Sequence, residues 1–483
     1  MQLRVIQRIL GLLLMVFSVT MLPPVMVGAI YAEAASYSFL IAFFVTLITG
    51  LLLWLPVRKF VRELHLRDGF IVVVMFWSVL ALFGSIPFML IDELSMSFIE
   101  ALFESMSGLT TTGATVITGL DELPKTLLFY RQELQWLGGM GIIVLAVAIL
   151  PMFGIGGMQL YRAETPGPMK DNKLTPRITE TAKALWYIYL GLTVSCAVAY
   201  WLAGMTLFDA ICHSFSTVAI GGFSTHDASI GYFESTSIEA VAVVFMLLAG
   251  INFALHFIAV RSMRVSAYWA DAEFRAYITV LFIVGIIVCT YLYFHHTFGT
   301  IGGVLHHGLF QVVSIGTTAG FTTADYHNWP GFLPALLLLL SFVGGCAGST
   351  GGGMKVIRVL LLIKQGSREI LRLIHPNAEI PVKVGGVSLN SRVIGSVWGF
   401  FALYVLAFCF MSLLLAATGL DLVTAFSAVA ACINNLGPGL GEVGSNYASI
   451  PDTAKGILCF AMLLGRLEIF TLLVLLSPAF WRA

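Results

Sequence analysis

Charged side chains are scarce in this sequence. Asp, Glu, Lys and Arg make up only 11% of its 483 residues, against roughly 25% in an ordinary soluble domain. Apolar residues make up 58%, and the mean hydropathy is +0.93, which is more apolar surface than a water-soluble chain of this length can bury. The composition therefore excludes a soluble enzyme and predicts a protein whose main solvent is a lipid bilayer.

Several chemical signatures are missing as well. The seven cysteines form no CxxC pair and have no metal-ligand spacing, so we interpret them as small core residues. Carboxylates and histidines do not cluster at one depth within the apolar runs, which argues against a polytopic membrane enzyme. Lys plus Arg equals Asp plus Glu, at 26 each, and nothing indicates a nucleic-acid partner.

Long charge-free runs are what the sequence does have, and about 20 such residues suffice to cross a hydrocarbon core as a helix. The eight clear runs are 9–32, 34–57, 70–91, 134–161, 184–207, 240–260, 329–354 and 393–420. Two weaker ones, 276–293 and 456–477, bring the predicted count to ten. Arg4 and Arg8 precede the first run and no small-residue cleavage site follows it, so we expect a retained helix rather than a signal peptide.

The distribution of basic residues predicts the orientation. With the N-terminus inside and ten spans, 22 of the 26 Lys and Arg residues fall in the cytoplasm. Only Lys125 and Lys455 lie in outer loops, while Arg131 and Arg466 lie within spans. The positive-inside rule is then satisfied at every loop, and both termini are cytoplasmic. Arg131, near an outer end, is interpreted as an interfacial residue.

Four predicted outer connections contain a shorter apolar stretch that is followed by a glycine. The stretches are 98–109, 207–215, 304–315 and 422–433, and the glycines are Gly113, Gly222, Gly320 and Gly437. The glycines are 109, 98 and 117 residues apart, and six positions before them stand Ser107, Ser216, Ser314 and Ala431. This regularity predicts a fourfold internal repeat of span, short helix, glycine turn and span.

The predicted fold is therefore an all-α polytopic membrane protein with ten transmembrane helices. Residues 1–67 form two N-terminal helices, and four repeats follow around a pseudo-fourfold pore. The repeats are 68–162, 163–265, 266–383 and 384–483. Non-helical backbone at membrane depth survives where it lines a cavity, and the C-terminal ends of four short helices favour a cation at their centre. Acidic outer loops agree with that sign.

These repeats, with TTGAT, GGFST, TAGFT and NLGPG after the short helices, resemble the Trk/Ktr/HKT superfamily of potassium transporters, most closely its bacterial uptake subunits. The resemblance covers essentially the whole chain. It implies potassium uptake, with rubidium as a similar ion, across the bacterial inner membrane, and no other cofactor. It also implies a homodimer within membrane lipid, regulated by a cytosolic nucleotide-binding ring subunit called TrkA.

The same resemblance assigns a selectivity filter. Its carbonyl groups would come from Thr111, Thr112 and Gly113; Ile220, Gly221 and Gly222; Thr318, Ala319 and Gly320; and Asn435, Leu436 and Gly437. All four copies differ from the TVGYG of potassium channels. The fourth differs most, because Asn434, Asn435 and Pro438 replace the Thr-rich and Phe positions.

A glycine-rich segment, GGCAGSTGGG, interrupts the third repeat. Its residues are Gly344, Gly345, Cys346, Ala347, Gly348, Ser349, Thr350, Gly351, Gly352 and Gly353. Each glycine costs about 1 kcal/mol relative to alanine in a helix, so we expect the helix to break in mid-membrane. A phosphate-binding loop is disfavoured because the GK[ST] motif that it requires is absent. A glycine face for helix packing is the stronger alternative to a broken helix. The resemblance favours a loop that plugs the pore, as a gate.

Arg466 lies in the last predicted span, two residues before Glu468. This spacing places the two on different helix faces, and a buried arginine costs at least about 2.5 kcal/mol. Two interpretations stay open: an ion pair that joins two repeats, or part of the gate beside the pore carbonyls. A proton- or sodium-coupled symporter with broken helices is the alternative function for the whole chain.

Overall fold

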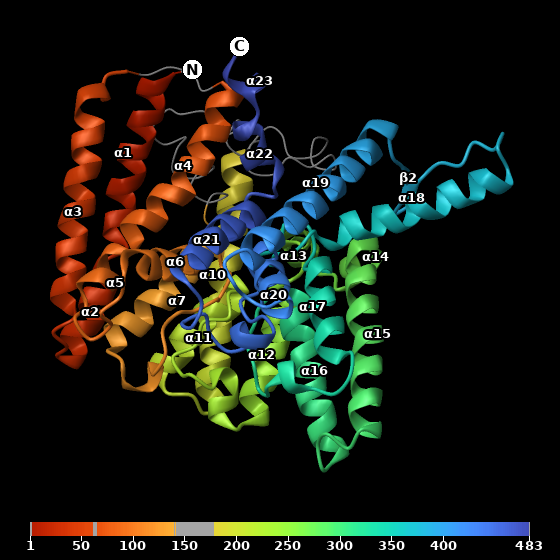
Figure 1. The fold of residues 1–483 in the computed structure, drawn as a ribbon, viewed down its shortest axis with the longest axis horizontal. Coiled ribbons are helices and arrows are strands. Elements are labelled where there is room, and N and C mark those ends of the chain that lie inside the picture. Colours follow the sequence, from red (N-terminus) through yellow and green to blue (C-terminus); the bar gives the residue numbers. More distant parts are fainter. Residues whose placement is uncertain (1, 61–64, 140, 142–177, 483) are drawn as a thin grey trace.

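The computed structural model describes residues 2–60, 65–139, 141 and 178–482, and the regular elements in these residues are helices and one short hairpin (Figure 1). Six helices are long and apolar enough to cross a membrane, or up to eight if each of two bent helix pairs is counted as one span. The prediction of a helical membrane protein is confirmed. Most of the predicted span 134–161 lies outside the described residues.

The N-terminal helices pack together and against the first repeat. They are α1 Leu3–Val19, α2 Leu22–Tyr31 and α3 Ser36–Trp54. α1 and α3 approach closely at Gly11, where an added Cβ would lie 2.8 Å from the Gly50 carbonyl oxygen. Small residues allow such contact between helices in a membrane. α1 also packs on α4, and α2 on α7, so this unit covers the outside of repeat 1.

Each repeat contributes an outer helix, a short pore helix and an inner helix. The outer helices are α4 Leu66–Gly84, α10 Ile178–Leu202, α15 Ala272–Phe294 and α19 Ser391–Ala416. The pore helices are α6 Phe98–Leu109, α11 Leu207–Ala219, α16 Ile301–Thr317 and α20 Leu422–Ile433. The inner helices are α7 Lys125–Gly139, α12 Thr236–Ala249, α17 Leu333–Val343 and α21 Asp452–Arg466.

The pore helices begin where the sequence supplies a capping side chain. A side-chain oxygen at each N-cap accepts a hydrogen bond from a backbone N–H of the first turn; the caps are Ser97, Thr206, Thr300 and Asp421. Ser, Thr and Asp are preferred at this position because they satisfy N–H groups that have no partner within the helix. The four short apolar stretches are thus confirmed as helices with a common start signal.

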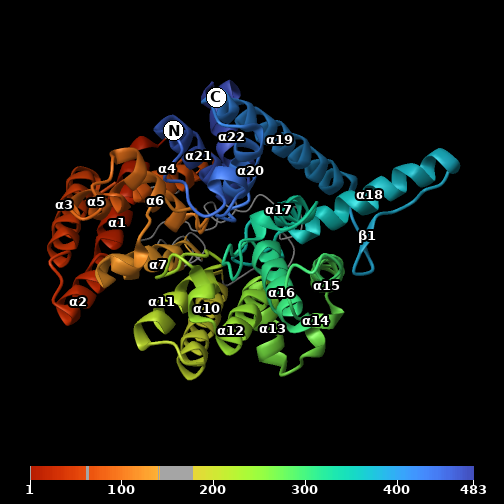
Figure 2. The same ribbon diagram turned by 60° about the horizontal axis from the view of Figure 1, so that its bottom comes forward.

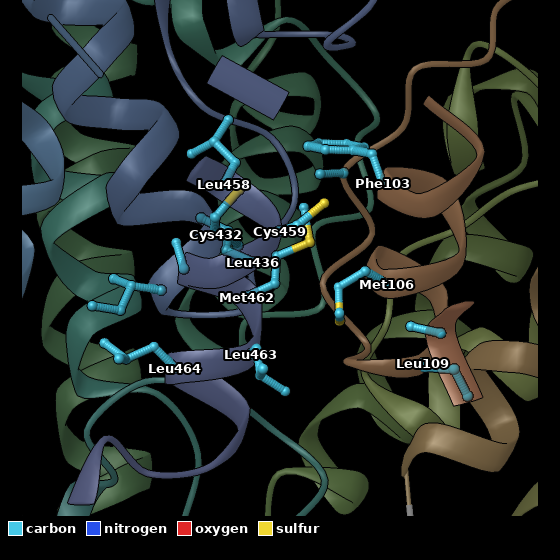
Figure 3. Packing of buried hydrophobic residues seen from close by; sticks show 14 of the residues in the cluster. Phe103, Met106, Leu109, Cys432, Leu436, Leu458, Cys459, Met462, Leu463 and Leu464 are labelled. Atoms are coloured by element: carbon cyan, nitrogen blue, oxygen red, sulfur yellow. The ribbon is translucent and has the colours of Figure 1, made fainter. Parts of the chain in front are cut away.

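The repeats follow one another around a common centre (Figure 2). The inner helix of each packs against the pore helix of the next: α7 on α11, α12 on α16, α17 on α20, and α21 on α6. The last contact closes the ring between repeats 4 and 1. Figure 3 shows it from close by, with Phe103 and Met106 of α6 beside Leu458, Cys459 and Met462, all buried.

Two of the predicted spans are broken into two helices each. In 240–260, α12 is followed by α13 Phe253–Ser262 at 95°, and Asn252 caps the new helix through Ala254 N–H. In 456–477, α21 is followed by α22 Phe470–Leu476 at 117°. Between α21 and α22, Glu468 and Ile469 have left-handed φ values of 51° and 61°, which a continuous helix does not allow. The span 329–354 likewise keeps only the helix that ends at Val343.

The remaining elements are short connections and one projection. α18 Val356–Ile374 and the hairpin of β1 Lys383–Val384 with β2 Val387–Ser388 extend away from the body (Figures 1 and 2). The described chain ends lie on one side of the molecule (Figure 1). The other short helices are α5 Ile86–Leu90, α14 Ser266–Ala270 and α23 Pro478–Trp481, with 3-10 turns η1 Leu55–Val57, η2 Leu120–Glu122, η5 Ser229–Phe233, η6 Tyr326–Asn328 and η7 Gly441–Val443.

Candidate functional site

The four segments after the pore helices, here called filter segments (111–113, 220–222, 318–320 and 435–437), share one backbone conformation. The residue two positions before each glycine has a left-handed φ: Thr111 55°, Ile220 54°, Thr318 71° and Asn435 53°. The glycines themselves have φ of 80° at Gly113, 78° at Gly222, 80° at Gly320 and 96° at Gly437. Residues with a Cβ rarely adopt this region, so four copies in register are a repeated structural device.

Hydrogen bonds to the pore helices hold the same register. The N–H of the middle filter residue donates to the carbonyl five positions earlier: Thr112 to Ser107 at 2.9 Å, Gly221 to Ser216 at 2.8 Å, Ala319 to Ser314 at 2.7 Å and Leu436 to Ala431 at 2.8 Å. These carbonyls belong to the small residues that recur six positions before each glycine. The alignment made on the glycines therefore describes four equivalent backbones, including the fourth copy.

The filter segments interlock in chain order. A Cβ added to a filter glycine would lie very close to a carbonyl oxygen of the next repeat. The separations are 2.1 Å from Gly113 to the Gly221 oxygen, 2.0 Å from Gly222 to the Ala319 oxygen, 2.1 Å from Gly320 to the Leu436 oxygen, and 2.8 Å from Gly437 to the Thr112 oxygen. Each glycine thus lies against the middle residue of the next repeat, and the fourth lies against the first. The predicted segments form one closed ring that has no room for side chains at the glycines.

A cavity of 610 Å³, here called the vestibule, opens on the side of the ring that the topology predicts to be outside. All four filter glycines line it, together with the residues that follow them. Asp227 and Asp325 are among the lining residues, and Asp227 accepts a hydrogen bond from Leu120 N–H at 3.0 Å. Carboxylates in a concave mouth attract cations, so the vestibule can concentrate them above the ring.

One histidine joins two outer loops at the vestibule. The His226 imidazole contacts the carboxylate of Asp121 from repeat 1, lies 3.7 Å from that of Asp209, and stacks on Tyr232 at 3.5 Å between ring centroids. Partial burial acts to lower the pKa of His226, but the nearby carboxylates of Asp209 and Asp121 outweigh it and raise the pKa above 6.5.

This raised pKa predicts a pH-dependent contribution to stability. Because the folded-state pKa lies above the unfolded value, the contribution is complete below that value and is lost as the pH rises through the raised pKa. We expect His226→Gln to lower the thermal unfolding temperature in detergent more at about pH 6 than at about pH 8.5. An equal loss at both pH values would contradict the pairing with Asp121 and Asp209.

The glycine-rich segment 344–353, here called the gate loop, lies against the opposite side of the ring. Gly352 N–H donates to the Thr318 hydroxyl at 2.7 Å, and Gly353 N–H donates to the Asn434 carbonyl at 3.0 Å. The Thr350 hydroxyl donates to the Val218 carbonyl at 2.9 Å. The predicted break is confirmed, and its residues contact the pore-helix ends or filter segments of repeats 2, 3 and 4.

Arg466 connects the gate loop to the remaining repeat. Its guanidinium donates to the Thr111 hydroxyl at 3.1 Å, to the Thr350 carbonyl at 3.3 Å and to the Gly139 carbonyl at 3.2 Å. Glu468 lies beyond the end of α21, and its carboxylate binds Arg358 at the start of α18. The structure thus brings Arg466 together with the filter of repeat 1 and the gate loop.

Comparisons with known proteins agree over the full length. A family model for TrkH, described as a cation transport protein, matches residues 35–482. The chain belongs to the TrkH family. The Trk system potassium uptake protein TrkH of Vibrio parahaemolyticus is 60% identical over 485 residues, and that of Escherichia coli K12 is 55% identical over 482, each covering 100% of both chains. The crystal structure of the potassium transporter TrkH from Vibrio parahaemolyticus has 57% identity and a TM-score of 0.91, covering 100% of both chains.

Membership of the TrkH family makes the chain a transporter rather than an enzyme, as the sequence predicted. Within the described residues, no three His, Cys, Asp or Glu side chains are placed to hold a metal ion.

Sequence reasoning missed two buried acids at this TrkH-family site. Arg131 was predicted to be interfacial, which is wrong: its side chain is 1% exposed and its Nε lies 2.8 Å from Glu104 Oε1. Glu104 precedes Arg131 by 27 residues, so the local sequence around Arg131 did not indicate this ion pair. Buried Glu273 of α15 accepts hydrogen bonds from the N–H groups of Ala347 at 2.7 Å and Ile357 at 3.1 Å, and so ties the gate loop to the start of α18. Neither acid stands out in the sequence, because Glu104 shares its helix with Glu100 and Glu273 lies between Asp271 and Arg275.

Proposed function

We propose that this protein takes up potassium across the bacterial cytoplasmic membrane through the ring of four filter segments. The observation that carries the proposal is ring closure, since each filter glycine contacts the next repeat and Gly437 returns to Thr112. Carbonyl groups in such a ring can replace the hydration shell of a potassium ion. Relatives at 55–60% identity are named potassium uptake proteins, and rubidium would follow the same path.

The gate loop is proposed to close this path from the cytoplasmic side. This role is supported by the contacts of the loop with two filter segments, through Thr318 and, by way of Arg466, Thr111, and with the end of the fourth pore helix at Asn434. A glycine-rich segment can change conformation without steric penalty. Conduction then requires the loop and Arg466 to move aside, because a fixed cation in a potassium path opposes permeation.

The wider organisation is part of the same proposal. Ten spans, with repeats 68–162, 163–265, 266–383 and 384–483 after the N-terminal pair, would leave both termini in the cytoplasm. We propose a homodimer in membrane lipid, with a TrkA-like nucleotide-binding ring docked on the cytoplasmic face. α18, which projects from the body and carries exposed Arg372 and half-buried Arg368, is a candidate docking element, and copurification tests it.

Channel-like conduction and proton- or sodium-coupled symport predict different currents. In vesicles holding the purified protein, we expect the reversal potential to follow the potassium gradient and to be unaffected by imposed pH or sodium gradients. A shift with either gradient would favour the symporter. Absence of potassium flux under every gradient, with the regulatory partner present, would contradict the proposed function itself.

A further inference from the structure

The pore helices carry a repeated position behind the filter whose chemistry differs between repeats. Nine residues before the filter glycines stand Glu104, His213, Gln311 and Ala428. The first three are fully buried, with 0% exposure. A buried polar side chain is retained where it has hydrogen-bond partners, so their partners indicate what this position does.

All three polar side chains bind the segment that follows the filter glycine, here called the post-filter segment. His213 Nε2 lies 2.9 Å from the Ser224 hydroxyl, and Gln311 Nε2 donates to the Ala324 carbonyl at 3.0 Å. Glu104 accepts from Thr115 at 3.0 Å and from Val116 N–H at 3.0 Å. In repeat 4 the adjacent Ser427 exchanges hydrogen bonds with Leu440 N–H and C=O, at 2.9 and 3.1 Å.

Repeat 1 differs because the polar group at this position, Glu104, is part of an ion pair whose arginine also contacts repeat 2. The Arg131 guanidinium on α7 donates to Glu104 at 2.8 Å, to the Thr115 hydroxyl at 3.1 Å and to the Ser224 carbonyl at 3.1 Å. Its Cζ lies 4.3 Å from the ring centroid of Phe223, which directly follows Gly222. One guanidinium therefore fixes the post-filter segments of two neighbouring repeats.

We propose that the Glu104–Arg131 pair is a selectivity brace: it sets the spacing between the filter segments of repeats 1 and 2 and so contributes to the discrimination of potassium from sodium. This inference rests on the proposed function. A charged pair in a low-dielectric interior, with its donors used in fixed geometry, resists the displacement that a smaller ion would require. Glu104 and Arg131 are positioning residues, because they act through backbone segments.

Bi-ionic reversal potentials, with potassium on one side of the vesicle and sodium on the other, test the brace. The double variant Glu104→Gln with Arg131→Met removes both charges, so no unpaired charge is left buried. Arg131→Lys keeps the charge, but a single ammonium does not reproduce the planar fork that binds Glu104, Thr115 and Ser224 together. We expect the sodium-to-potassium permeability ratio to rise about tenfold in the double variant and about threefold in Arg131→Lys, as charge-assisted hydrogen bonds are lost.

Lys455→Met is the matched control. It breaks another pair on the same pore helix, Lys455 with Glu100 at 2.8 Å, which joins the start of α6 to α21 rather than to a post-filter segment. We expect the permeability ratio of this variant to match the unsubstituted protein. The brace is overturned if the Glu104 and Arg131 variants fold and keep the original ratio, or if the control shifts it equally. If the double variant does not fold, the permeability ratio of Arg131→Lys decides whether the brace exists. If the unsubstituted protein itself does not discriminate potassium from sodium, the proposed function is refuted instead.

Discussion

Replacing Gly222 with alanine is expected to reduce potassium selectivity over sodium by at least about tenfold. The new Cβ would lie 2.0 Å from the Ala319 carbonyl oxygen, in a backbone with φ of 78°. Overpacking of this kind costs about 1–3 kcal/mol even in ordinary cores, and here the atom displaced belongs to the filter of the next repeat. Bi-ionic reversal potentials in vesicles measure the loss.

The ring geometry also predicts a graded series. Gly113→Ala and Gly320→Ala should resemble Gly222→Ala, because their added Cβ atoms would lie 2.1 Å from carbonyl oxygens. Gly437→Ala should be the mildest, since the corresponding separation is 2.8 Å. Gly191→Ala on α10, with open space around it, is the control for glycine replacement as such. Unchanged ion preference in all four filter variants would contradict the assignment.

Replacing Gly352 with alanine is expected to raise potassium flux per folded molecule by about tenfold, with selectivity retained. A change of about 1.4 kcal/mol in the free energy between the closed and open positions of the gate loop changes the population of the open position by that factor. The added Cβ would lie 1.9 Å from the Asn434 carbonyl oxygen, so the gate loop must leave the ring. Shortening the loop should act in the same direction and reduce dependence on a regulatory partner. Rubidium flux into vesicles, normalised to the amount of folded protein, is the measurement.

Two further variants separate a gate from a structural element. Gly366 lies on α18, and a Cβ added there would have no other atom within 4 Å, so Gly366→Ala should leave the potassium flux unchanged. Arg466→Ala should raise flux if the arginine is part of the barrier, and should instead lower the amount of folded protein if its contacts are mainly structural. Unchanged flux after both loop shortening and Gly352→Ala would exclude the gate loop as the barrier.

Much of the repeat could be predicted from the sequence because it depends on local signals. A Ser, Thr or Asp cap, an apolar stretch and a glycine recur in all four repeats, and the structure turns each set into a pore helix and a filter segment. Gly344–Gly353 was likewise predictable, since six glycines in ten residues do not sustain a helix.

What the sequence did not reveal depends on partners far along the chain. Glu468 and Ile469 break the last span with left-handed φ although neither is glycine, and the partner of Glu468 is Arg358, 110 residues earlier. Arg131 was misplaced because its partner Glu104 is on another helix. The left-handed residues before the filter glycines, such as Ile220, also lack any local signal, because the ring imposes their conformation.

The central claim is that four filter segments form a single potassium-binding ring, and heavy-ion density tests it most directly. Structures of the purified protein in rubidium or thallium salts should show density on the axis enclosed by Gly113, Gly222, Gly320 and Gly437, and this density should be lost in Gly222→Ala. A matched sodium structure should lack it. Ion density found only outside the ring, or equal density in sodium, would contradict the account.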